Sequence, residues 1–169
     1  MTLRIRTATV QDLPEMYRIS VSAHVAGYAT FIPESERERF DTRYVVTPEG
    51  EAKYIAKMAP RLEDPSWLLW VAEKDGRVLG YTLAQKVNDH HLLKKGMFVD
   101  PASQGEGVGS ALFQASLEPI TSGIIELSVI TNNERAKHIY EKNGFKVVGT
   151  DPETYFGATL DVMRLTKEN

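Results

Sequence analysis

The sequence contains no cysteine, so disulfide bonds, thiolate metal sites and a covalent cysteine intermediate are all excluded. Long apolar runs are missing as well, since no stretch approaches the roughly 18 apolar residues of a membrane span. The first residues, 1–6, alternate apolar with basic side chains and do not form the apolar centre of a signal peptide. We therefore expect a cytoplasmic protein that binds no metal and does not act at a membrane.

An excess of charge of one sign is also absent. The chain has 20 basic and 23 acidic side chains, for a net charge of −3. This balance supplies no field for wrapping a polyanion, so we expect no nucleic-acid partner. With 42% hydrophobic and 25% charged residues in a chain of 169, the composition is typical of one packed domain, which we place at residues 1–169.

Strand-like and helix-like patterns alternate along the chain. Thr47 and Pro48 supply an N-cap and a first-turn proline for a helix that should stop by Asp64. Between residues 24 and 46 no clean period is visible, and we expect only a short charged helix flanked by loops. Strands are expected at 3–5, 67–73, 78–84, 92–99, 124–130, 145–149 and 158–165, and further helices after residue 12, from 108 toward 119, and at 133–143.

The order of these elements predicts the fold class. Residues 92–130 read as strand, helix, strand, which requires a right-handed parallel crossover. The segment 67–84, with Asp75-Gly76 at its reversal, predicts an antiparallel hairpin, and the last two strands predict another. We expect a single α/β (α+β) domain with a mixed, mostly antiparallel sheet, a central parallel strand pair and helices on both faces.

A glycine-rich turn lies between the strand at 92–99 and the next helix. Unpaired amides and the positive helix terminus converge there, which predicts an anion site. A turn that merely allows close packing is the alternative. No lysine follows the glycines as in a nucleoside triphosphate loop, and the third glycine comes one residue early for a dinucleotide fingerprint. The turn comprises Gln104, Gly105, Glu106, Gly107, Val108, Gly109 and Ser110.

Two segments resemble the GNAT superfamily of N-acetyltransferases. Residues 99–109 are similar to its acetyl-CoA pyrophosphate loop, Gln/Arg-x-x-Gly-x-Gly/Ala after a strand ending in Val-x-Pro, and residues 104, 107 and 109 fill the three defined positions. Residues 133–145 are similar to the later segment Asn-x-x-Ala-x-x-x-Tyr-x-x-x-Gly-Phe. The resemblance implies the GNAT-like acyl-CoA N-acyltransferase fold, acetyl-CoA as acyl donor, and direct acetyl transfer to a primary amine.

The resemblance also implies roles for individual residues. Tyr140 would protonate the departing CoA sulfur, and the backbone N–H of Val99 would stabilise the oxyanion beside a bulge for which Gly96 is a plausible device. Asn133 and Tyr140 are seven residues apart, two helical turns, so both can line one extended ligand. The residues expected to bind acetyl-CoA are Phe98, Val99, Gln104, Gly105, Glu106, Gly107, Val108, Gly109, Ser110, Asn133 and Tyr140.

The general base stays open at this point. Glu126, on the strand opposite the loop, is the named candidate, with Asp89, His90 and His91 as alternatives. Lys94 and Lys95 occupy strand positions where some relatives carry an acid, and a water relay is a further route. Acceptor specificity is expected from the region 24–46 and the last turn, where the candidates are His24, Tyr28, Phe31, Glu34, Glu36, Glu38, Tyr155 and Phe156.

The leading hypothesis is an acetyl-CoA-dependent N-acetyltransferase. Its acceptor would be a primary amine of a small molecule, an amino acid, a polyamine or a peptide N-terminus. A non-catalytic acyl-CoA-binding sensor is the alternative from another class, and a nucleotide-dependent oxidoreductase comes third. Apolar strand edges near the C-terminus would allow a homodimer.

Overall fold

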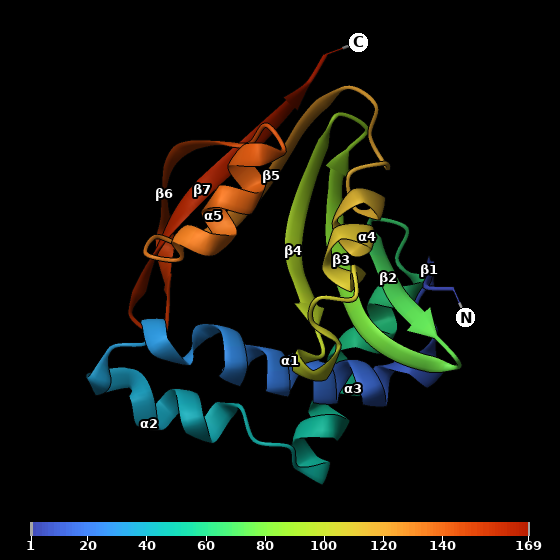
Figure 1. The fold of residues 1–169 in the computed structure, drawn as a ribbon, viewed down its shortest axis with the longest axis vertical. Helices are drawn as coiled ribbons and strands as arrows, with labels where there is room; N and C mark the ends of the chain where they lie inside the picture. Colours follow the sequence, from blue (N-terminus) through green and yellow to red (C-terminus); the bar gives the residue numbers. More distant parts are fainter. Residues whose placement is uncertain (1, 169) are drawn as a thin grey trace.

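One seven-stranded sheet organises the computed structural model, which describes residues 2–168; Met1 and Asn169, the ends of the predicted domain, lie outside the described residues. The strand order is β1-β2-β3-β4-β5-β7-β6 (Figure 1). The strands are β1 (Arg4–Thr7), β2 (Trp67–Lys74), β3 (Arg77–Asn88), β4 (His91–Val99), β5 (Gly123–Ile130), β6 (Lys146–Tyr155) and β7 (Ala158–Lys167), and the helices are α1 (Leu13–Tyr28), α2 (Glu34–Arg43), α3 (Pro48–Glu63), α4 (Val108–Ala115) and α5 (Glu134–Lys142).

Local sequence signals set several of these boundaries. Helix α3 begins where the Thr47 hydroxyl accepts a hydrogen bond from the Gly50 amide at 2.9 Å, with Pro48 in the first turn. It ends before Asp64, as predicted. Asp75 and Gly76 both have positive φ, 54° and 77°, the geometry of a tight two-residue reversal between β2 and β3.

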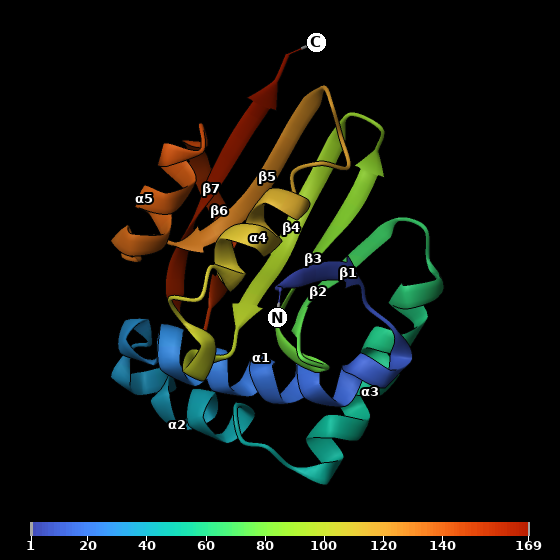
Figure 2. The same cartoon turned by 45° about the vertical axis from the view of Figure 1, so that its right-hand side comes forward.

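Helices cover both faces of the sheet (Figure 2). Helices α1 and α3 pack their apolar stripes on β2 and β3 around Leu13, Met16 and Met58. On the other face, Leu112 of α4 and Tyr140 of α5 pack over the centre and the C-terminal strands. A β-carbon at Gly80 would lie 2.8 Å from the Phe98 carbonyl oxygen and 3.0 Å from a Val108 methyl, so glycine permits the close approach of α4.

The central strands β4 and β5 are the only parallel pair within residues 2–168, and their pairing is short. It covers the three residue pairs from His91 with Ile124 to Leu93 with Glu126. Beyond it the register of β4 against β3 shifts, because Ala84 pairs with Lys94 and Leu83 with Gly96, which leaves Lys95 as an extra residue. This confirms the bulge expected beside Gly96. In Figure 1 the strands β5, β6 and β7 diverge from β4 toward α1.

The region 24–46 is more regular than its sequence suggested. Helix α1 continues to Tyr28, and α2 follows after a short turn. The helical period is hidden there because His24, a polar residue, is buried among aromatic rings. Strands β3 and β6 are also longer than predicted. Across residues 2–168, no helix has both the length and the apolar character to cross a bilayer.

Candidate active site

The glycine turn holds the first amides of α4 open. Gly105 and Gly107 adopt φ of 87° and 80°, a left-handed conformation that a β-carbon disfavours. Gly107 is the N-cap residue, and no side chain caps the helix there. The amides of Val108, Gly109 and Ser110 have no intrahelical acceptor, because they occupy the first turn. The turn therefore presents several N–H groups and a positive helix end to one point, as an anion site requires.

The strand β4 directs two amides toward β5. The Asp100 amide donates to the Leu79 carbonyl at 2.8 Å, which makes Val99 and Gly80 a non-hydrogen-bonded antiparallel pair. The Val99 N–H therefore points away from β3, and the alternation of the ladder gives Met97 the same direction. Both amides face the side on which β5 has diverged. Phe98, between them, directs its amide to β3.

A cavity of about 200 Å³ lies between the diverging strands. Asn133, the N-cap residue of α5, and Tyr140, within α5, both line this cavity, as their spacing predicts. The side-chain oxygen Oδ1 of Asn133 accepts from the Ala136 amide at 3.2 Å, so Asn133 caps α5 while its side-chain NH₂ group stays available. The other lining residues are His24, Tyr28, Lys94, Lys95, Gly96, Met97, Phe98, Leu127, Ser128, Val129, Ile130, Ala136, Tyr155 and Leu160.

Tyr140 is held as a protonated phenol at this cavity. Its ring packs against Phe113 and Phe145, with centroids 5.8 and 5.9 Å away. Burial, with a smaller contribution from Tyr28, raises the pKa of the Tyr140 hydroxyl to about 12. The group keeps its proton at neutral pH and can donate it to a stronger base that forms nearby.

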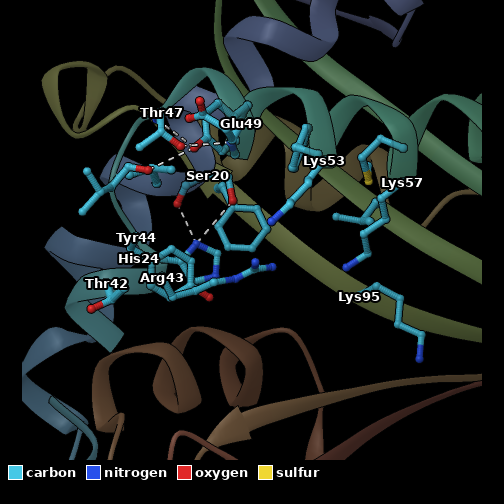
Figure 3. Close-up of a pocket in the computed structure, with 18 of the residues that line it drawn as sticks. Ser20, His24, Thr42, Arg43, Tyr44, Thr47, Glu49, Lys53, Lys57 and Lys95 are labelled. Atoms are coloured by element: carbon cyan, nitrogen blue, oxygen red, sulfur yellow. Dashed lines mark hydrogen bonds between the residues drawn. The ribbon is translucent and has the colours of Figure 1, made fainter. Parts of the chain in front are cut away.

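A second cavity of about 1230 Å³ lies among α1, α2, α3 and β4. It shares His24, Lys95 and Phe98 with the smaller one, so these three residues stand where the two cavities meet. The His24 ring is stacked on Tyr44 and Phe98, with centroid distances of 4.2 and 4.6 Å. Figure 3 shows His24 and Tyr44 at one end of the cavity.

His24 carries an imidazole of fixed tautomer. Its Nδ1 lies 2.6 Å from the Ser20 carbonyl oxygen, which can only accept, so Nδ1 bears the proton and Nε2 the lone pair. Burial, opposed by the Ser20 hydrogen bond, lowers the pKa of His24 to about 4. The sequence placed His24 only among acceptor contacts. Its isolated position in a helix gave no signal for proton transfer.

Glu126, the named base candidate, lies at the closed end of the parallel pair and lines neither cavity. Its carboxylate accepts from Arg164 at 2.9 Å and lies 2.6 Å from His91 Nε2. Although burial opposes the change, these partners lower the pKa of Glu126. The geometry therefore favours a structural role for Glu126, which is ion-paired with Arg164 and in contact with His91, and the role of Glu126 or His91 as base stays a prediction.

The other candidates divide between the cavities and the surface. Glu38 lines the larger cavity and Tyr28 and Tyr155 the smaller, whereas Phe31, Glu34, Glu36 and Phe156 line neither. Asp89 and His90 lie in the turn before β4, remote from both. Among residues 2–168 no group of three or more His, Asp or Glu side chains is arranged to hold a metal.

Comparison with known proteins decides the family. Residues 65–147 match the family model described as an acetyltransferase (GNAT) domain. An uncharacterized N-acetyltransferase of Mycobacterium bovis is 31% identical over 114 residues, which are 62% of this chain and 73% of that protein. The chain belongs to the GNAT acetyltransferase family. The resemblance read from the two motifs and the assignment to N-acetyltransferases are thereby confirmed.

Further matches agree with this GNAT assignment. A mycothiol acetyltransferase of Propionibacterium freudenreichii is 36% identical over 102 residues, 56% of this chain and 32% of the relative. The crystal structure of PaiA N-acetyltransferase from Thermoplasma acidophilum in complex with coenzyme A has a TM-score of 0.75 at 19% identity and covers 98% of this chain and 99% of that one. This likeness confirms the predicted fold class.

Proposed function

We propose that the protein is an acetyl-CoA-dependent N-acetyltransferase that acetylates a primary amine, with residues 1–169 acting as a single catalytic domain in the cytoplasm. The observation that carries this proposal is that α4 begins with open amides after the glycine turn, while Met97, Asn133 and Tyr140 line one cavity beside β4. The amides of Val99 and Met97 face away from β3, and Val99 and the glycine turn line neither cavity. We expect acetyl-CoA to extend along β4 from the glycine turn to the smaller cavity.

Acetyl-CoA is the acyl donor. The turn from Gln104 to Ser110 binds its pyrophosphate through backbone amides, and glycine lets the main chain approach without a β-carbon in the way. The pantetheine arm follows the gap beside β4, where Met97 and the free amide hydrogens of Asn133 provide hydrogen-bonding groups. The thioester then reaches the cavity that Tyr140 lines.

The transfer is direct. The amine nitrogen attacks the thioester carbonyl carbon, the new C–N bond forms, and the oxyanion accepts a hydrogen bond from the Val99 N–H, which contributes about 3 kcal/mol. The C–S bond then breaks, and Tyr140 gives its proton to the departing sulfur. The Tyr140 hydroxyl is suited to this step because its high pKa keeps it protonated until the thiolate develops.

His24 is the residue best placed to receive the amine proton. It stands where both cavities meet and presents a lone pair on Nε2, on the side of the ring opposite its bond to Ser20. Its low pKa keeps the ring neutral at neutral pH. The nearby charge of Lys95, which lines both cavities, lowers the pKa of an amine bound beside it, so the acceptor reaches the thioester with its lone pair free.

A non-catalytic sensor is disfavoured by the same features. A binding site for coenzyme A alone has no need of a second cavity that meets the first at His24 and Phe98. Nor does it require a buried phenol beside the thioester position. The family assignment also points to catalysis.

Thiol release from acetyl-CoA, measured across a panel of amines, tests the proposal. Amine-dependent release is expected, and its absence across a broad panel would support the sensor. Tyr140→Phe should lower kcat by about 100-fold or more, the usual loss of a general acid, while leaving the Kd for coenzyme A unchanged. An equal loss of kcat and coenzyme affinity would instead make Tyr140 a structural residue.

A further inference from the structure

Basic side chains dominate the larger cavity, although the whole chain carries a net charge of −3. Six basic residues line it against two acidic ones. The sequence had drawn attention to the acids of this region, but only Glu38 of that group reaches the cavity, together with Glu49. The basic residues are Arg39, Arg43, Lys53, Lys57, Arg61 and Lys95.

Two of these cations have partners within the protein. Arg39 forms an ion pair with Glu36 at 2.9 Å and also lies over the Phe156 ring. Arg61 lies over the Trp67 ring, 3.9 Å from its centroid. Within the described part of the chain, the remaining four form no ion pair with a carboxylate; they are Arg43, Lys53, Lys57 and Lys95.

The four cations come from three elements and surround one space. Lys53 and Lys57 are one turn apart on α3, so their side chains share a face, and like charges at this spacing repel. Figure 3 shows both ammonium groups pointing down from α3 into the cavity, with Arg43 and Lys95 on its other sides. Desolvation, with smaller contributions from the charges of Arg61 and Arg43, lowers the pKa of Lys57.

We propose that the acceptor amine carries carboxylate or phosphate groups that Lys53, Lys57 and Arg43 bind, while its amino group reaches the thioester past His24 and Phe98. This inference rests on the proposed acetyl transfer and names its substrate class. The bound anion would compensate the repulsion along α3. It would also hold the amine in one orientation, since an anchor at the far side of the cavity directs the other end toward the junction.

The same charges select against polyamines. A polycation in the cavity would meet four positive charges with only Glu38 and Glu49 to offset them. A neutral amine would gain nothing from the basic residues. We therefore expect kcat/KM to be highest for anionic amines, lower for neutral amines and lowest for polycations.

Matched amines test this ranking. The thiol-release assay compares O-phosphoethanolamine with ethanolamine, aspartate and glutamate with alanine amide, and both sets with spermidine. The kcat/KM for an anionic amine should exceed that of its neutral counterpart at least about tenfold, the usual worth of one charged hydrogen bond. The phosphate and carboxylate arms identify which anion the site prefers. Equal or better use of neutral amines or spermidine would overturn the inference and leave the acetyltransferase proposal standing.

Substitutions locate the site. Lys53→Ala and Lys57→Ala should each raise KM for the anionic amine about tenfold and leave KM for acetyl-CoA unchanged. Lys146→Ala is the matched control, because Lys146 is an exposed lysine on β6 that lines neither cavity. Unchanged KM in both α3 variants would contradict the assignment.

A binding measurement separates this inference from the proposed function. Calorimetric titration of O-phosphoethanolamine and aspartate into the protein without acetyl-CoA requires no catalysis. Binding that weakens in Lys53→Ala and Lys57→Ala supports the anion site even if no amine is acetylated, a result that would defeat only the proposed function. Failure of both compounds to bind at millimolar concentration, or binding that the α3 variants leave intact, would overturn the anion site.

Discussion

Replacing Gly107 by alanine separates the coenzyme role of the glycine turn from its structural role. Gly107 has φ of 80°, and a β-carbon built there meets nothing within 4 Å. The folded protein therefore loses only the cost of left-handed backbone in an L-residue, about 1 to 2 kcal/mol. For a domain of this size that corresponds to a Tm lower by about 2 to 8 °C. The loss for coenzyme A is separate, because we expect the new methyl group to enter the open space that the pyrophosphate occupies in the proposed complex.

Gly76→Ala is a closely matched control. Gly76 has φ of 77°, and a β-carbon there likewise meets nothing within 4 Å, so its conformational cost is the same. Coenzyme A affinity is measured by calorimetry for both variants, and Tm by thermal unfolding without ligand. Loss of one amide-to-phosphate hydrogen bond, worth about 1.5 to 3 kcal/mol, should weaken coenzyme binding about 10- to 100-fold in Gly107→Ala alone. Equal affinities in the two variants would refute the pyrophosphate assignment.

Two further variants test buried groups by their pH dependence. The folded-state pKa of His24 is about 4, below its unfolded value of 6.5, so the native protein should lose up to about 3 kcal/mol of stability as the pH falls from 6.5 to 4. In His24→Phe, urea unfolding measured at several pH values should show no such loss. If the loss persists in this variant, another group causes the acid sensitivity. Desolvation lowers the pKa of Lys94 to about 8, so burying its charge costs stability below that pH. The Lys94 ammonium donates a hydrogen bond to the Ser116 hydroxyl. Lys94→Met should nevertheless add about 1 to 3 kcal/mol at pH 7 and abolish a rise in stability between pH 8 and 10.5, because the Ser116 hydroxyl keeps its own bond to the Phe113 carbonyl. A less stable variant would contradict this.

Much of the fold follows from local signals in the sequence. The Thr47 cap, the Asp75-Gly76 turn and the strand-helix-strand order of residues 92–130 each depend on neighbours in the chain, and each predicted the observed element. The extent of α1 could not be predicted in this way. His24 interrupts its apolar pattern, and the ring is buried only because Tyr44 and Phe98 come to it from distant segments.

The site, too, has features that follow from local sequence and features that depend on distant segments. Asn133 and Tyr140 belong to one helix, so their shared face could be derived from spacing, and the structure brings both to one cavity. The base could not be derived, because the choice depends on which carboxylates are already paired. The sequence does not show that the Glu126 carboxylate has a partner, but in the structure it accepts a hydrogen bond from Arg164 on the neighbouring strand. The basic lining of the larger cavity was hidden for the same reason, since α2, α3 and β4 contribute to it separately.

A single turnover with excess protein over acetyl-CoA tests the central claim most directly. The protein is mixed with acetyl-CoA and an acceptor amine, and free thiol, acetylated amine and acetylated protein are measured over time. Direct transfer predicts that thiol and acetylated amine appear at one rate and in equal amounts, that Tyr140→Phe slows both together, and that no acetylated protein accumulates. Thiol release that precedes acetylated amine, with the acetyl group held on the protein, would contradict the account.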